Sequence, residues 1–244
     1  MRLDAVARQS LSVGVATGAY GLSFGALSVA AGLDLWQTQA LSALLFTGGS
    51  QFAVVGILGA GGLGSTAVAT SSLLGIRNGL YGLELSRELG FHGWRRVAAA
   101  HLTIDESTAV AMAQSGRGDA RRGFWLTGLA VFVFWNLMTL AGALVGNTLG
   151  DPRTWGLDAA AAGAFCALLW PRLRRREAQA TAVIAVVLTL VAMPHTPAGV
   201  PVLVAALAAA VVAGWPGARR TAAAPSSPEP PPAGNAATAE EDAR

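Results

Sequence analysis

Long apolar stretches alternate with short polar segments along the first 215 residues of this chain. An α-helix needs about 20 residues to cross about 30 Å of hydrocarbon. Stretches of this length, or slightly shorter, cover residues 11–33, 124–145, 178–193 and 200–215. A further short stretch is bounded by Trp155 and Trp170, as is typical of membrane interfaces. The pattern predicts an all-α, polytopic integral membrane protein.

The pattern is interrupted between residues 37 and 113. Polar or glycine-rich islands at 48–51, 77–78 and 105–106 lie within apolar sequence. Irregular backbone is tolerated at membrane depth only where protein or a water-lined cavity surrounds it. We therefore expect broken or re-entrant helices in the N-terminal half, with the interruptions in segments 44–52, 73–82 and 101–108.

The charges indicate topology rather than nucleic-acid binding. Arginine supplies all 17 basic residues, against 14 acidic ones, for a net charge of +3. The arginines occur in short runs between apolar stretches and form no basic face interleaved with aromatics, so a nucleic-acid partner is not expected. Under the positive-inside rule, Arg2 and Arg8 place the N-terminus in the cytoplasm, and the runs at 172–176 and 219–220 mark two further cytoplasmic segments.

The same rule constrains the path of the N-terminal half. Residues 86–96 and 114–122 both carry arginines and should lie on the cytoplasmic side. The stretch 37–85 must then cross the membrane an odd number of times, and 97–113 must return to the side that it left.

The chain of 244 residues divides into three parts. We expect residues 1–10 to form a cytoplasmic N-terminus, 11–215 a transmembrane domain, and 216–244 an Ala/Pro-rich cytoplasmic tail whose composition predicts disorder. Cys166 is the only cysteine, which excludes an internal disulfide, and we interpret it as a small buried hydrophobic residue.

Small residues recur in the first apolar stretch at steps of three and four: Gly14, Gly18, Gly21, Gly25, Ser28 and Gly32. At 3.6 residues per turn these positions share one helix face. A stripe of small residues lets another backbone approach closely, which is a main source of helix association in lipid. We interpret the stripe as a helix-packing surface. A narrow substrate path along the same face is the alternative.

The segment 44–52 contains Gly48, Gly49, Ser50 and Gln51 in sequence. Each glycine weakens a helix by about 1 kcal/mol relative to alanine. A half-helix that ends here would expose backbone N–H and carbonyl groups able to hold a polar ligand. The alternative is a tight helix crossing in which Gln51 bonds to a neighbouring helix, and the sequence favours neither.

Charged residues within apolar sequence are functional hypotheses at membrane depth. The guanidinium of Arg77 either extends to the cytoplasmic interface or clamps a carboxylate. Asp105 and Glu106 follow Thr103, and Thr103 with Glu106 matches a capping box at an interfacial helix start. The alternative is a role in proton coupling or in binding an ammonium group. An arginine and a carboxylate that reach one cavity would suit a zwitterion such as an amino acid.

Two other polar residues admit structural interpretations. His101 lies one helical turn before Asp105 and is placed for a proton relay, although a structural role is the simpler interpretation. Asn136 follows Trp135 in an apolar stretch and either bonds across helices or packs. The sequence contains no P-loop, HExxH, GxSxG or paired-cysteine motif, which argues against an ATPase subunit or a conventional hydrolase. We expect no cofactor and no metal.

Three motifs together resemble the AzlC-like branched-chain amino acid permease family, the large subunit of AzlC/AzlD-type exporters. They read Tyr20-Gly21-Leu22-Ser23-Phe24-Gly25, Phe46-Thr47-Gly48-Gly49-Ser50-Gln51-Phe52 and Thr103-Ile104-Asp105-Glu106-Ser107. Residues 156–165 and the run Trp170-Pro171-Arg172-Leu173 also fit, so the resemblance covers about 14–215. One motif differs, because Gly75-Ile76-Arg77-Asn78 stands where the family usually reads Asn-x-Arg-His.

The resemblance implies export of valine and related hydrophobic amino acids across a bacterial inner membrane, with a small AzlD-like membrane subunit as partner. The missing ATPase signals favour secondary transport. We expect Asp105 or Glu106 to face the substrate ammonium or to carry a coupled proton. The expected substrate-binding residues are Ser23, Gly48, Gly49, Ser50, Gln51, Arg77 and Asn78. The alternatives are a membrane-embedded enzyme, for which Asp105, Glu106 and His101 are the only catalytic candidates, and a non-transporting membrane scaffold.

Overall fold

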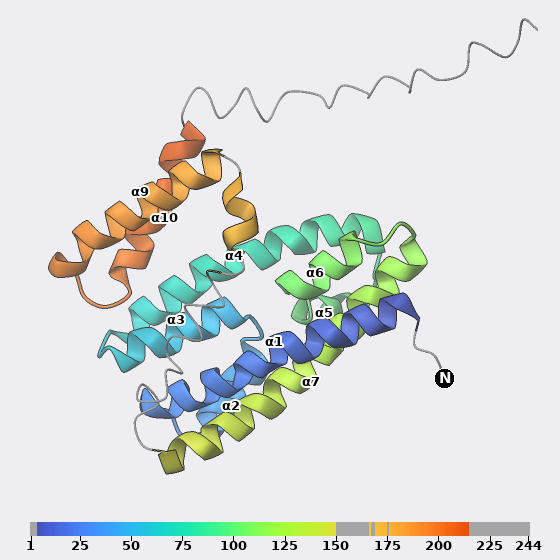
Figure 1. Ribbon diagram of the computed structural model, residues 1–244, viewed down its shortest axis with the longest axis horizontal. Coiled ribbons are helices and arrows are strands. Elements are labelled where there is room, and N and C mark those ends of the chain that lie inside the picture. The colour runs from blue at the N-terminus through green and yellow to red at the C-terminus, as the bar shows by residue number, and fades with distance from the viewer. Residues whose placement is uncertain (1–3, 150–165, 167–168, 175, 215–244) are drawn as a thin grey trace, which may run out of the picture.

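The structure, a computed structural model, describes residues 4–149, 166, 169–174 and 176–214, and within these ranges it is helical with no strand (Figure 1). The α-helices are α1 (Ala5–Ala30), α2 (Leu35–Leu44), α3 (Gly48–Gly59), α4 (Gly64–Leu89), α5 (Trp94–His101), α6 (Asp105–Met112), α7 (Arg117–Leu149), α9 (Arg176–Ala192) and α10 (Val200–Gly214). Short 3₁₀ helices cover Trp170–Arg174 and Met193–His195.

Three helices in the described part of the chain are long and apolar enough to cross a membrane: Ala5–Ala30, Arg117–Gly146 and Arg176–His195. The protein is therefore an all-α, polytopic membrane protein, as the apolar pattern predicts. Most of the expected short stretch between Trp155 and Trp170, and the whole expected tail at 216–244, lie outside the described residues. Cys166 is exposed, so its interpretation as a buried residue is wrong.

Helices α1 and α7 lie side by side and run in the same direction (Figure 1). The small-residue stripe of α1 faces α7: a Cβ atom on Gly14 would lie 2.5 Å from the Cβ of Ala130, and one on Gly25 would overlap the carbonyl oxygen of Thr139. Later residues of α1 therefore lie beside later residues of α7, and the two helices stay in contact over this length. Gly32, expected in the same stripe, lies beyond the end of α1 with φ +93°, and a Cβ there would meet no described atom within 4 Å.

The first turns of α1 and α7 are joined by charge. Asp4 caps α1, because its Oδ1 accepts a hydrogen bond of 2.8 Å from the backbone N–H of Ala7. The same carboxylate forms an ion pair with Arg122 of α7. This end of the molecule holds the N-terminus and lies on the right in Figure 1. We call it the N-terminal end.

Helices α2 and α3 form a hairpin at the far end of the molecule. After α1 ends, Asp34 caps α2 through a 2.8 Å bond from the N–H of Gln37. The helix is interrupted at residues 45–47, and α3 then returns until Gly59 lies beside Ala31, at the end of α1. The hairpin thus enters and leaves at the end opposite the N-terminus, and it confirms the expected interruption in segment 44–52.

Helix α4 runs from the far end back to the N-terminal end as one continuous helix. It ends where Gly90 adopts a left-handed conformation, φ 58°, which glycine accepts without strain. The expected interruption at 73–82 is wrong, because the α-helix continues through Arg77 and Asn78. The charge at this position is compensated by an ion pair to another helix rather than by a break in the backbone.

Helices α5 and α6 form a second hairpin, which enters from the N-terminal end. The helices before and after the hairpin are held together. Arg117 Nε at the start of α7 donates to the carbonyl of Glu88 at the end of α4 (2.8 Å), and Arg121 Nε donates to that of Leu89 (2.7 Å). The hairpin is interrupted at residues 102–104. Within the described residues, α4 runs from one end of the molecule to the other, and the second hairpin leaves and re-enters at the same end. The expected number of membrane crossings within 37–85 stays a prediction, because α4 is not among the three helices that are long and apolar enough to span a membrane.

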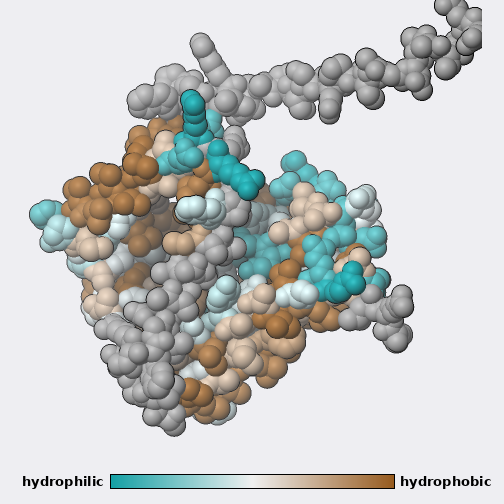
Figure 2. Space-filling view, in the orientation of Figure 1, coloured by the Kyte–Doolittle hydropathy of each residue, from teal (hydrophilic) through white to brown (hydrophobic). Residues whose placement is uncertain are grey.

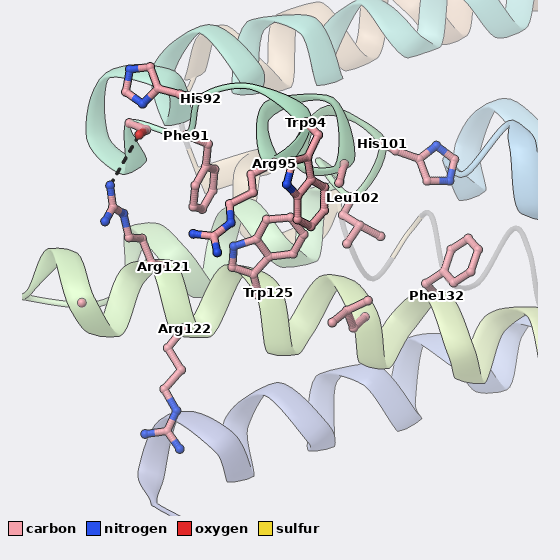
Figure 3. Close-up of a pocket in the computed structure, with 14 residues that line it drawn as sticks. Phe91, His92, Trp94, Arg95, His101, Leu102, Arg121, Arg122, Trp125 and Phe132 are labelled. Carbon is pink, nitrogen blue, oxygen red and sulfur yellow. Dashed lines mark hydrogen bonds between the residues drawn. The ribbon is translucent and has the colours of Figure 1, made fainter.

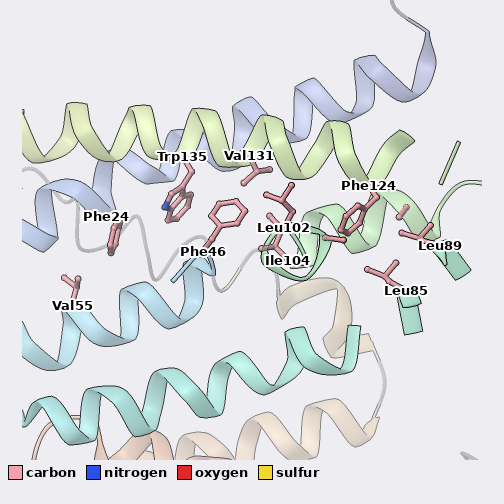
Figure 4. Packing of buried hydrophobic residues seen from close by; sticks show 12 residues of the cluster. Phe24, Phe46, Val55, Leu85, Leu89, Leu102, Ile104, Phe124, Val131 and Trp135 are labelled. Atoms are coloured by element: carbon pink, nitrogen blue, oxygen red, sulfur yellow. The ribbon is translucent and has the colours of Figure 1, made fainter. Parts of the chain in front are cut away.

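The two interruptions meet near the middle of α7. The ring of Phe46, from the first interruption, lies 5.0 Å from that of Phe132 on α7 and 5.9 Å from that of His101, at the end of α5. A Cβ on Gly128 of α7 would lie 3.1 Å from the Cβ of Leu102, in the second interruption. Figure 4 shows the buried side chains from both hairpins facing α7 along one line.

Helices α9 and α10 form a third hairpin, which packs against α4. Their bounds match the predicted apolar stretches 178–193 and 200–215. Thr70 of α4 donates to the carbonyl of Gly199, in the turn between them (3.4 Å). Apolar residues cover this hairpin and the lower edge of the molecule, while hydrophilic residues gather towards the N-terminal end (Figure 2).

Candidate functional site

Gln51 stabilises the interruption of the first hairpin. Its Nε2 donates to the carbonyls of Leu41 (3.4 Å), Ser42 (3.0 Å) and Leu45 (3.0 Å), which belong to the last turn of α2. The Leu41 carbonyl also accepts from the backbone N–H of Leu45 (3.1 Å) and the Leu45 carbonyl from that of Thr47 (2.5 Å), so the amide adds to the bonds at the end of α2, where the helix stops. Both interpretations of this segment therefore hold in part: a half-helix ends here, and Gln51 bonds to the neighbouring half. Its buried Oε1 has no hydrogen-bond partner among the described residues.

Ser107 has the matching role in the second hairpin. Its Oγ accepts from the N–H of Ile104 (3.1 Å) and donates to the carbonyl of Leu102 (2.6 Å). The expected capping box of Thr103 with Glu106 is wrong: the Thr103 hydroxyl instead donates back to the carbonyl of Ala99 at 2.7 Å. A serine three residues into α6 is a sequence signal that could have identified the true cap.

Half-helices α3 and α6 both begin at the meeting point of the interruptions and run towards opposite ends of the molecule. The N-terminus of a helix carries partial positive charge from its unpaired N–H groups. Thr47, the residue before α3, makes no side-chain bond to the first turn of that helix. A Cβ on Gly48 would lie 3.2 Å from the Trp135 ring, so glycine leaves this turn closely packed against α7.

Helix α4 contacts both interruptions. Ser50, in the first turn of α3, donates a buried 2.8 Å hydrogen bond to the carbonyl of Ser71. One turn further on, Gly75 leaves room for that hydroxyl, which a Cβ would approach to 3.8 Å. Arg77 then reaches the other hairpin, where its Nη1 lies 2.8 Å from Oδ2 of Asp105, the first residue of α6.

The ion pair leaves hydrogen-bonding capacity unused. The Arg77 side chain is 37% exposed and that of Asp105 only 16%. Buried atoms without a hydrogen-bond partner in the described residues include Arg77 Nε, Asp105 Oδ1 and Asn78 Oδ1. Unpaired buried polar atoms cost free energy, about 1–3 kcal/mol each, unless a ligand or water pairs with them. The site therefore offers a donor and two acceptors to a polar solute.

Glu106 lies next to Asp105 in the first turn of α6, close to the hydroxyl of Thr17 on α1 and within electrostatic reach of Arg77 on α4. Thr17 lies between Gly14 and Gly18 along α1, whose glycine face packs on α7. Sequence reasoning missed Thr17, although a hydroxyl beside a glycine stripe in an apolar helix was a usable signal.

The remaining expected site residues lie near the interruptions without a direct bond to the ion pair. Gly49 and Ser23 are buried, and Ser23 adjoins Phe24 on α1. The Phe24 ring packs on Trp135 (6.0 Å between centroids) and on Phe52 (5.7 Å), which forms an aromatic cluster behind the start of α3.

The two polar residues with structural interpretations contribute no polar group to the ion pair. His101 lies among aromatic rings, 5.9 Å from that of Phe46 and 5.8 Å from that of Phe132. The side chain of Asn136 donates to the carbonyl of Phe132 in its own helix (2.8 Å), while its backbone carbonyl accepts from Gln39 of α2 (3.3 Å). Within the described ranges, no three His, Cys, Asp or Glu side chains are grouped to hold a metal ion.

The chain is similar to a known family over most of this region. The family model described as AzlC protein matches residues 12–149, which include α1 from its eighth residue onwards, α2 to α7, both interruptions and the ion pair. The similarity expected further on, at 156–165 and 170–173, lies beyond this match. No curated protein and no solved structure matches the chain. Because the match covers more than half of the sequence, this multi-pass membrane protein belongs to the AzlC family, a family of transporters.

Proposed function

We propose that this protein is a secondary transporter that exports branched-chain or other hydrophobic amino acids across a bacterial inner membrane, together with a small AzlD-like membrane subunit. The observation that carries the proposal is the ion pair between Arg77 and Asp105, which joins α4 to the interruption of the second hairpin. Membership of the AzlC family supports the transport of branched-chain amino acids.

The ion pair explains how a zwitterion is selected. The substrate carboxylate takes the place of Asp105 on the guanidinium of Arg77, and the carboxylate released from that pair binds the substrate ammonium. After this exchange, Arg77 and Asp105 are each still paired with an opposite charge. A substrate with one charge would leave Arg77 or Asp105 unpaired, at a cost of about 1–3 kcal/mol, less than for a fully buried pair because the Arg77 side chain is 37% exposed.

Backbone and amide groups at the first interruption complete the polar half of the site. The first turn of α3 presents N–H groups from Gly48, Gly49 and Ser50, and partial positive charge there favours a carboxylate. Asn78 lies next to Arg77 on α4 and supplies an unpaired Oδ1 that can accept from an ammonium. Gln51 maintains the interruption by holding the carbonyls of α2.

The surroundings of this polar centre favour an apolar side chain on the substrate. The rings of Phe24, Phe52 and Trp135 pack together as a largely buried aromatic cluster at the start of α3. Burial of an aliphatic side chain of the size of valine or leucine stabilises binding by about 1.5–3 kcal/mol. Polar amino acids lack this gain and would have to desolvate their side chains as well.

The inverted arrangement of the two hairpins suits alternating access. One hairpin enters from each end, and their interruptions meet at the middle of α7 (Figures 1 and 4). Since the ion pair fastens α6 to α4, its opening by substrate releases the second hairpin while the first remains bonded to α4 through Ser50. Arg117, Arg121 and Arg122 at the N-terminal end support a cytoplasmic location for that end under the positive-inside rule.

Radiolabelled valine efflux from vesicles tests the proposal. Vesicles that contain this protein, with and without the small subunit encoded near it, are loaded with labelled valine and placed under a proton gradient of either sign. We expect efflux that depends on the protein and responds to the gradient, with valine recovered unchanged. Equal efflux from empty vesicles, or recovery of a chemically altered product, would contradict it.

A further inference from the structure

A groove of ≈ 1030 Å³ lies between α5 and α7, away from the ion pair of Arg77 and Asp105 (Figure 3). It begins at the N-terminal end, at the loop that carries Phe91, and runs along α7 as far as Phe132. Most of its wall is aromatic or aliphatic. The apolar lining includes Phe91, Trp94, Leu102, Trp125, Leu129 and Phe132.

The mouth of the groove is cationic. The guanidinium of Arg121 is held by a 2.7 Å bond to the carbonyl of Leu89 and lies 5.7 Å from the ring centre of Phe91. Arg95 lies 6.0 Å from the ring centre of Trp94, and both arginines border the same groove (Figure 3). The described residues that line the groove include no aspartate or glutamate, so these positive charges are not neutralised from within it.

The apolar part of the groove has the depth of one leaflet. Arg121 and Phe132 are eleven residues apart on α7, which is about 16 Å of helix at 1.5 Å per residue. Half of a hydrocarbon core of about 30 Å is about 15 Å. A headgroup at Arg121 would therefore place an acyl chain beside Trp125 and Leu129, with its end at Phe132 near the mid-plane.

We propose that this groove binds an anionic phospholipid, with its phosphate between Arg95 and Arg121 and one acyl chain along α7. Basic pockets between helices at a membrane surface suit such headgroups. The charge pattern favours a lipid over a helix of another protein, because a transmembrane helix would cover the apolar wall and leave the two guanidinium groups without an anion. The proposal needs the chain to be embedded in a membrane but does not depend on what it transports.

Native mass spectrometry tests the headgroup contact. The full-length protein is released from micelles that contain dioleoyl phosphatidylglycerol or dioleoyl phosphatidylcholine at equal concentration. We expect phosphatidylglycerol adducts to survive at least fivefold better than phosphatidylcholine adducts, and Arg95→Gln to remove this preference. Arg96→Gln is the matched control, because Arg96 is exposed on the same helix and does not line the groove.

A second pair of variants tests the acyl chain without changing any charge. Ala98 lines the groove and Ala100 is an exposed residue of the same helix outside it. We expect Ala98→Trp to displace bound phosphatidylglycerol and Ala100→Trp to retain it. Equal retention of both lipids by the wild type, or equal retention by Arg95→Gln and Arg96→Gln, would overturn the proposal. So would purification of the complex with a polypeptide subunit crosslinked at position 98 and no lipid in the groove.

Discussion

Nη1 of Arg77 lies 2.8 Å from Oδ2 of Asp105, although 27 residues, which include helix α5, separate the two in the chain. Arg77 lies in the continuous helix α4, while Asp105 is the first residue of the half-helix α6. The ion pair thus connects the continuous helix α4 to the second hairpin at the point where that hairpin is interrupted. A substrate that competes for either charge also changes how α6 is held.

Removal of either partner should destabilise the protein. Arg77→Gln leaves Asp105 largely buried without its counter-ion, and Asp105→Asn leaves the guanidinium unpaired. We expect each change to lower the free energy of unfolding by about 1–3 kcal/mol, less than for a fully buried pair because Arg77 is 37% exposed. Thermal unfolding of the purified protein in detergent measures this.

The double variant separates the pair from the other roles of each residue. We expect Arg77→Gln with Asp105→Asn to cost about 1–2 kcal/mol less than the sum of the single changes. Arg87→Gln, an exposed change on the same helix, should alter stability by less than about 0.5 kcal/mol. Strictly additive single changes would mean that the two side chains do not interact.

The contribution of Gln51 to stability should come from its side-chain N–H groups, which donate to the carbonyls at the end of α2. Gln51→Ala leaves the carbonyls of Leu41, Ser42 and Leu45 without its amide, at a cost of about 1–3 kcal/mol. Gln51→Glu should cost at least as much, because a carboxylate would face the same carbonyls. Gln39→Ala removes one 3.3 Å bond and serves as the smaller control. Thermal unfolding that ranks Gln39→Ala as the most damaging of the three would contradict this account.

The close approach of α1 and α7 should tolerate no added side chain. Gly25→Ala would drive a Cβ into the carbonyl of Thr139, so we expect a loss of stability of about 2 kcal/mol or more. Gly56→Ala is the matched change on α3, where a Cβ meets no described atom within 4 Å, and it should be neutral or stabilise by up to about 1 kcal/mol. A pair of variants with equal melting temperatures would show that the stripe does not pack.

We infer that Glu106 carries a coupled proton, because Asp105 holds the direct ion pair with Arg77 and Glu106 forms no ion pair within the described part of the chain. We expect Glu106→Gln to keep valine exchange between the two sides of a vesicle and to lose acceleration of net efflux by a proton gradient. Thr17→Val should retain that acceleration. If Glu106→Gln responds to the gradient as the wild type does, the coupled proton is carried elsewhere.

Helix positions followed well from the sequence, because apolar length is a direct requirement of a bilayer. The predicted stretches 124–145, 178–193 and 200–215 lie within or along α7, α9 and α10. The arginine runs also predicted a return within 97–113, and the second hairpin does begin and end at the same end of the molecule. These features are local in the chain, and each rests on composition over many residues.

Features that depend on partners distant in the chain were not predictable in the same way. The break expected at 73–82 is absent because Asp105 compensates Arg77, and no local pattern indicates that partner. The sequence predicted Thr103 as a helix cap, but its hydroxyl donates to the carbonyl of Ala99, and Ser107 accepts from the backbone N–H of Ile104 instead. The residue types of the ion pair suggested an amino-acid site, while their contact depends on the register between α4 and the second hairpin.

Competition by incomplete substrates tests the exchange of charges at Arg77 and Asp105 most directly. Inhibition of labelled valine transport is measured with valine, with isobutylamine, which lacks the carboxylate, and with 3-methylbutanoate, which lacks the ammonium. In the wild type we predict that both incomplete compounds inhibit at least 100-fold more weakly than valine. Arg77→Gln should abolish the disadvantage of isobutylamine alone, and Asp105→Asn that of 3-methylbutanoate alone. Unchanged inhibition ratios in both variants would contradict a substrate site at this pair.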